Sequence, residues 1–124
     1  MQRKFRLTRS EDFRRVRRFG KSYAHPLMVL VVQAVDGTSV RGASSTQVRV
    51  GVAAGRLVGT AVKRNRAKRL LRAAMQPLLP GLASGWDVIL IARPELANST
   101  LNETRQALES LLQRSKLIAP SNAA

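Results

Sequence analysis

The 124-residue chain carries 22 lysine and arginine residues against seven acidic ones, which gives a formal net charge of +15 at pH 7. The apolar share of 44% is normal for a globular protein, and the length suits one domain with a modest core. The absence of cysteine excludes disulfides, thiolate zinc sites and cysteine nucleophiles. Such an excess of positive charge indicates a polyanionic partner, and nucleic acid is the expected one.

A membrane surface is the competing polyanion. No segment reaches the ~18 apolar residues that a spanning helix needs, and the most basic segment has no Trp or Phe on its apolar side. The N-terminus also lacks the apolar stretch and cleavage site of an export signal. We therefore expect a cytoplasmic protein without a membrane partner.

The N-terminal segment predicts a short helix over residues 9–19. Thr8 and Glu11 have the spacing of a capping box, in which each side chain binds a backbone N–H of the other's residue. Phe13 and Val16 share one face of this helix. From the residues alone, the favoured role of Phe13 is packing in the core.

Four segments have the pattern of strands. Residues 21–25 precede a proline and predict a short edge strand, whereas 27–32 and 87–92 are continuous apolar runs typical of strands covered on both faces. Residues 48–52 alternate around Arg49. The connection 36–47 is rich in glycine, serine and threonine and carries no candidate chemistry.

Residues 61–75 predict an amphipathic helix between two of these strands, with Thr60 as its N-cap. Ordinary solvated helix faces mix acidic with basic residues, but this segment contains no acidic residue. Lys63 and Arg64 lie at the end where the helix dipole is already positive. A polyanion is expected to offset this repulsion, and Arg56 and Lys63 are placed to assist phosphate binding at the helix N-terminus.

The final helix begins at a second capping box, formed by Thr100 and Glu103, and places a row of leucines on one face. We expect residues 1–119 to form a single RNA-binding domain and residues 120–124 a flexible tail.

The sequence offers no convincing catalytic or metal site. His25 is the only histidine, and the seven carboxylates include no cluster suited to a two-metal nuclease. A basic protein of this kind is best interpreted as a binder whose chemistry lies elsewhere, which points to a ribonucleoprotein.

The stretch from Ala61 to Arg72 closely resembles the RNR signature of the bacterial ribonuclease P protein subunit. The resemblance extends along most of the chain, in matching order and spacing, to Arg6-Leu7, Glu11-Asp12-Phe13, Val50-Gly51, Asp87-Val88-Ile89 and Ala92-Arg93. Two departures lie beside these matches: Arg17 stands where the family often has an aromatic residue, and Leu57 and Thr60 replace a usual Lys and Asn.

The resemblance implies an α/β (α+β) two-layer sandwich with three helices and a mixed sheet of about four strands, similar to a domain of ribosomal protein S5. It also implies an RNA subunit that removes the 5′ leader of precursor tRNA with Mg²⁺ held mainly by that RNA. The protein would bind this catalytic RNA 1:1, together with the precursor tRNA. No small-molecule substrate and no catalytic or metal-binding residue in this chain are expected.

Two groups of site residues are implied by the resemblance. The residues expected to bind the RNA subunit are Lys63, Arg64, Asn65, Arg66, Lys68, Arg69 and Arg72. The residues expected to bind the leader, in a cleft between the first helix and the sheet, are Phe13, Phe19, Tyr23, Arg49 and Arg56.

Two alternatives remain at this point. A ribosomal protein or general RNA chaperone would share the charge and the fold and would differ in its target. A self-sufficient RNA-cleaving enzyme would differ in needing catalytic groups of its own.

Overall fold

The computed structural model describes residues 5–34, 48–82 and 85–117. Within them lies a four-stranded mixed sheet with the order β1-β2-β4-β3. The strands are β1 (Lys21–Ala24), β2 (Met28–Ala34), β3 (Arg49–Ala54) and β4 (Trp86–Ala92). The helices are α1 (Ser10–Phe19), α2 (Ala61–Met75) and α3 (Leu101–Arg114), with short 3₁₀ helices η2 (Arg56–Val58), η3 (Gln76–Gly81) and η4 (Pro94–Asn98). The predicted class, with three helices and a mixed sheet of four strands, is confirmed.

The sheet becomes mixed at its last pair. β2 runs antiparallel to β1 and β4, whereas β3 runs parallel to β4. A parallel pair needs a crossover connection, and α2 with η3 supplies it between β3 and β4. The predicted order of strand, basic helix and strand is therefore present, and β3 lies at an edge of the sheet.

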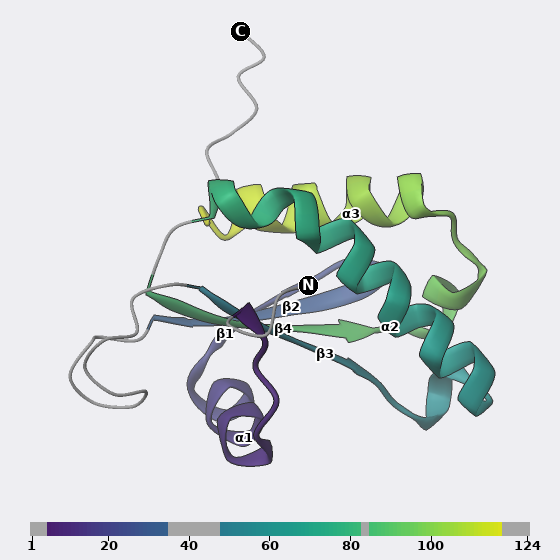
Figure 1. Ribbon diagram of the computed structural model, residues 1–124, viewed down its shortest axis with the longest axis horizontal. Helices are drawn as coiled ribbons and strands as arrows, with labels where there is room; N and C mark the ends of the chain where they lie inside the picture. Colours follow the sequence, from purple (N-terminus) through teal and green to yellow (C-terminus); the bar gives the residue numbers. More distant parts are fainter. Residues whose placement is uncertain (1–4, 35–47, 83–84, 118–124) are drawn as a thin grey trace, which may run out of the picture.

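Helices cover both faces of the sheet (Figure 1). α2 and α3 lie side by side over one face, and α1 lies against the other. Successive side chains of β2 point to opposite faces, so Leu30 packs into the core beneath α2 and α3 while Val31 packs against Leu7 and Val16 on the α1 side. This explains why the strand sequences are apolar without alternation.

The predicted caps of the two longer helices are confirmed. The Thr60 Oγ1 accepts a hydrogen bond from the N–H of Lys63 at 3.3 Å, which fixes the start of α2. At α3, Thr100 and Glu103 form the reciprocal capping box, with hydrogen bonds of 3.1 and 2.8 Å. The position of α2 on the sheet is set by four buried residues on its inner side, Ala67, Leu71, Ala74 and Met75.

The predicted capping box of the first helix is wrong. Arg9 is the N-cap of α1, and no side chain caps this end. The reason lies just before the helix, where the Leu7 N–H donates to the Val50 carbonyl at 2.8 Å and the Leu7 side chain is buried. This attachment of the chain to β3 places Thr8 beside the sheet edge instead of at the helix start. The predicted connection 36–47 and tail 120–124 lie outside the described residues.

Candidate nucleic-acid interface

A shallow groove runs along the solvent-facing side of α2. It is lined by Val62, Asn65, Lys68, Arg69 and Arg72, which recur at helical spacing along one side. Within the described residues, the side chains of its four polar members make no hydrogen bond or ion pair. We call this surface the helix groove. It presents three cations and an amide whose hydrogen-bonding groups are free for a ligand.

The other predicted residues of α2 lie away from this groove. Arg66 turns toward the start of α3, where its Nε donates to the Ala97 carbonyl at 2.8 Å and its Nη2 to the Ser99 carbonyl at 3.4 Å. Arg64 is half-buried, with its Nε enclosed and without a hydrogen-bond partner. Lys63 is exposed and its side chain lies over Gly59. The seven predicted residues therefore occupy more than one face of the helix.

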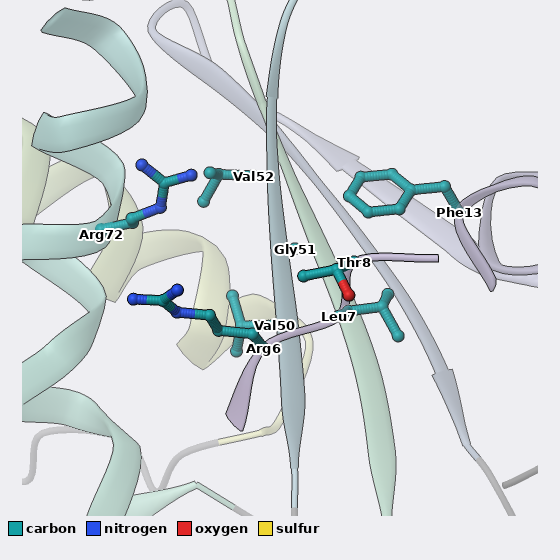
Figure 2. A pocket seen from close by; sticks show the side chains of 8 residues that line it. All are labelled: Arg6, Leu7, Thr8, Phe13, Val50, Gly51, Val52 and Arg72. Atoms are coloured by element: carbon teal, nitrogen blue, oxygen red, sulfur yellow. The ribbon is translucent and has the colours of Figure 1, made fainter. Parts of the chain in front are cut away.

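A second concave site lies at the open edge of β3 (Figure 2). Its lining consists of Arg6, Leu7, Thr8, Phe13, Val50, Gly51, Val52 and Arg72. We call it the edge cleft. Its volume of about 200 Å³ is below the roughly 300–1,000 Å³ of ordinary small-molecule sites. Beyond the bridge between Arg6 and Val50, the edge of β3 has no strand partner among the described residues, so it presents unpaired backbone groups.

The two sides of the edge cleft differ in chemistry. Figure 2 shows the guanidinium groups of Arg6 and Arg72 on the side of β3 that faces α2, and the ring of Phe13 on the side that faces α1. Phe13 is half-buried, and it packs against the core beneath α1. The interpretation of Phe13 as a core residue is thus correct for part of the ring, while another part lines the cleft.

A cluster of charged side chains fastens α1 to the sheet next to Phe13. Asp87 on β4 is fully buried and receives a forked pair of hydrogen bonds from Arg49 on β3, both 3.1 Å long. Arg15 on α1 donates to the same carboxylate at 2.6 Å. Asp12 faces both arginines, at 3.1 Å from Arg15 and 3.6 Å from Arg49. Paired geometry of this kind satisfies the buried carboxylate, which would otherwise be costly.

The charge cluster favours the ionised form of Arg15. Burial lowers the pKa of the Arg15 guanidinium, but its hydrogen bonds to Asp87 and Asp12 and their negative charges outweigh burial, so the pKa is raised above its ordinary value. Two carboxylates thus balance two guanidinium groups. Arg49, predicted from the resemblance to bind the leader, lies on the α1 side of the sheet but is engaged in this cluster and does not line the edge cleft.

The remaining residues predicted to bind the leader are not gathered around Phe13. Tyr23 pairs with Leu30 and packs on the opposite face of the sheet, under α2 and α3. Phe19 is 66% exposed at the end of α1, with the guanidinium carbon of Arg18 5.3 Å from its ring centroid. Arg56 is exposed in η2, beyond the end of β3.

Sequence reasoning missed the two other polar lining residues of the edge cleft, Arg6 and Thr8, and assigned Arg72 only to binding of the RNA subunit. Arg6 reaches the cleft because its segment bridges to Val50, a contact between residues far apart in the sequence. No periodic pattern signals a single bridge of this kind. The only available signal was the resemblance at Arg6-Leu7, to which no role was attached.

The described ranges 5–34, 48–82 and 85–117 offer neither a metal site nor a membrane span. No three or more His, Cys, Asp or Glu side chains come together there in a way that would hold a metal ion. No helix in these ranges is long and apolar enough to cross a membrane.

Comparison with known proteins decides the family. Residues 1–116 match the Ribonuclease P family. The chain belongs to the ribonuclease P protein family. The ribonuclease P protein component of Herpetosiphon aurantiacus is 40% identical over 117 residues, covering 94% of this chain and 89% of that protein. The ribonuclease P protein component of Chloroflexus aurantiacus is 36% identical over 124 residues, covering 98% and 86% respectively.

Solved ribonuclease P proteins share the fold. The protein from Staphylococcus aureus superposes with a TM-score of 0.76 at 24% identity, covering 92% of this chain and 97% of that one. The protein from Thermotoga maritima superposes with a TM-score of 0.73 at 25% identity, covering 88% and 98%. The family likeness therefore holds for the sequence and for the arrangement of the elements.

Proposed function

We propose that this chain binds the catalytic RNA of ribonuclease P through the helix groove and the 5′ leader of precursor tRNA through the edge cleft. As a member of the ribonuclease P protein family, it is one subunit of an endoribonuclease that contains an RNA subunit. The observation that carries the proposal is the helix groove, where Lys68, Arg69 and Arg72 have no protein partner among the described residues. One protein per RNA subunit is the expected ratio.

The helix groove suits a phosphate backbone. Its cations lie on a helix that is packed against the sheet through Ala67 and Leu71, so the backbone positions that carry them are set before binding. Contacts of this kind release counterions from the RNA and position it without reading its sequence. The Asn65 amide adds donors and an acceptor for sugar or base edges.

The edge cleft suits an unpaired strand. Phe13 presents part of an aromatic ring, and stacking on such a ring tolerates every base because every base has a π-face. Sequence-tolerant binding is what a leader that varies among precursor tRNAs requires. The cleft is open at the edge of β3, so a strand can enter and leave it without threading through a closed pore.

Hydrolysis is assigned to the RNA subunit, together with the Mg²⁺ that the family implies. Asp12 and Asp87 are two carboxylates that share partners, and both are bound by Arg15 and Arg49. They do not fit a Mg²⁺ site, which requires oxygen ligands free for the ion. The Nδ1 of His25 accepts the Leu27 N–H at 3.0 Å, which engages that nitrogen in a local turn. The role left to the protein is binding and neutralisation of charge.

The test is cleavage of precursor tRNA by the ribonuclease P RNA of the same cell, with and without the protein, over a magnesium series. We expect stimulation that grows as magnesium falls, because protein cations then replace screening by the metal. Arg69→Ala should raise the protein concentration needed for half-maximal stimulation. Arg105→Ala, which removes the same charge from an exposed position on α3, is the matched control and should leave it unchanged.

Two outcomes would contradict the proposal. Cleavage by the RNA-free protein would move catalysis into this chain. Preferential binding of ribosomal RNA over the ribonuclease P RNA, without any effect on cleavage, would favour the ribosomal protein or RNA chaperone alternative.

A further inference from the structure

Arg72 lines both surfaces described above. It contributes to the helix groove together with Lys68 and Arg69, and to the edge cleft together with Arg6 and Phe13. No other residue is common to the two linings. The helix groove and the edge cleft are therefore adjacent, and Arg72 lies where they meet.

The edge cleft has a cationic side opposite its aromatic one. Arg6 and Arg72 approach β3 from the α2 side, next to Val50 and Val52, while the Phe13 ring lies across the strand at Gly51 (Figure 2). A strand of RNA alternates between flat bases and charged phosphates. A strand that crosses the open edge of β3 can therefore present a base to Phe13 and a phosphate to the two guanidinium groups.

We propose that Arg6 and Arg72 hold the phosphate of the leader nucleotide whose base lies against Phe13, and that Arg72 also contacts the RNA subunit in the helix groove. The inference rests on the proposed function and adds a binding mode and a link between the two sites. A guanidinium has five N–H donors in a planar fork, enough to bind phosphates on two sides. Placed between two RNA strands, it offsets their mutual repulsion.

The alternative is that Arg72 serves the helix groove alone, as Arg69 does. Arg69 is the matched comparison, because it is the same residue type on the same helix and lines the helix groove without lining the edge cleft. Both side chains are exposed, and alanine is favourable in a helix, so both Arg→Ala variants should fold.

Two quantities separate these readings. The first is the affinity of the protein for the ribonuclease P RNA. The second is the leader gain, which we define as the dissociation constant for precursor tRNA with a single-nucleotide leader divided by that for precursor tRNA with a leader of several nucleotides. Both constants are measured on the assembled holoenzyme, with the protein in saturating excess. Saturation ensures that a weakened assembly does not lower the leader gain.

We expect Arg69→Ala to weaken assembly and to leave the leader gain unchanged. Arg72→Ala should weaken assembly and also lower the leader gain, by about tenfold for a lost charged hydrogen-bonding contact. It should also reduce the salt slope of leader binding by about 0.7, the value for one single-strand phosphate contact. Arg72→Lys keeps the positive charge but lacks the planar guanidinium group, so it should restore part of the leader gain and part of the salt slope.

Phe13→Leu tests the aromatic side of the edge cleft. This substitution should lower the leader gain without changing the affinity of the protein for the RNA subunit. The double variant Phe13→Leu/Arg72→Ala should lose less than the product of the single losses, because base and phosphate belong to one nucleotide and neither contact holds it well alone. Fully multiplicative losses would contradict the shared nucleotide.

The outcomes distinguish this inference from the function on which it rests. A leader gain unchanged in Arg72→Ala, with assembly weakened, overturns the inference and leaves the proposed function intact. A wild-type holoenzyme without any leader gain overturns both, because no leader would then occupy the edge cleft.

Discussion

The Phe13 ring lies so close to Gly51 that a Cβ atom built on this glycine would be 2.5 Å from the ring Cζ. The same Cβ would also be 2.9 Å from the carbonyl oxygen of Leu7, which is backbone and cannot rotate away. Glycine at this position of β3 thus serves a close approach and not a turn. It allows α1 and the segment before it to pack onto the strand, and it fixes where the aromatic side of the edge cleft lies.

Gly51→Ala should destabilise the protein by about 1–3 kcal/mol, because the added methyl group overpacks a contact between backbone and ring. The free energy of unfolding in urea measures this loss. Gly55→Ala is the control, since a Cβ there meets nothing within 4 Å; it should be neutral or stabilise by up to about 1 kcal/mol through the unfolded state. Equal stabilities of the two variants would show that the Phe13 contact is not tight in solution.

Asp87→Asn should destabilise the protein by about 3 kcal/mol. Removing one partner of a buried ion pair leaves Arg15 and Arg49 without their main counter-charge, and the low end of the usual range applies because Asp12 still faces both. Urea unfolding measures the change. Glu109→Gln makes the same change in charge at an exposed site on α3 and should stay within about 0.5 kcal/mol of wild type. If Asp87→Asn and Glu109→Gln lost similar amounts of stability, the cause would be the change in net charge and not the buried ion pairs.

Periodicity and capping signals in the sequence were sufficient to predict most of the helices and strands. The apolar runs of β2 and β4, the amphipathic pattern of α2 and the Thr100 capping box are local features, and each was confirmed. The Thr8 capping box failed because the bridge of the preceding segment to Val50 outweighed a local hydrogen bond. Competition between a local and a distant contact cannot be decided from spacing alone.

Of the two candidate surfaces, the sequence predicted the one that is built from local features. Charge along α2 identified the helix groove, since its residues recur on one element. The edge cleft combines residues from the N-terminal segment, α1, β3 and α2, so only the packed fold reveals it. The buried pairing of Arg49 with Asp87 was likewise invisible, because 38 positions separate these residues in the sequence.

Arg66→Ala should lower the stability of the protein, unlike the substitutions in the helix groove. Its two hydrogen bonds join α2 to the carbonyls of Ala97 and Ser99, and their loss should cost about 1–2 kcal/mol. Arg69→Ala is the control on the same helix and should leave the free energy of unfolding within about 0.5 kcal/mol of wild type. If Arg66→Ala unfolds at the same urea concentration as Arg69→Ala, the hydrogen bonds of Arg66 contribute nothing measurable.

The central claim, that the helix groove binds the phosphate backbone of the RNA subunit, is tested most directly by the salt dependence of assembly. The affinity of the protein for the ribonuclease P RNA should be measured over a range of salt concentrations for wild type, Lys68→Ala, Arg69→Ala and the control Arg105→Ala. We predict that each groove substitution lowers the slope of log affinity against log salt by roughly 0.9, the loss of one phosphate contact, and that the control keeps the wild-type slope. Unchanged slopes in both groove variants would contradict the claim.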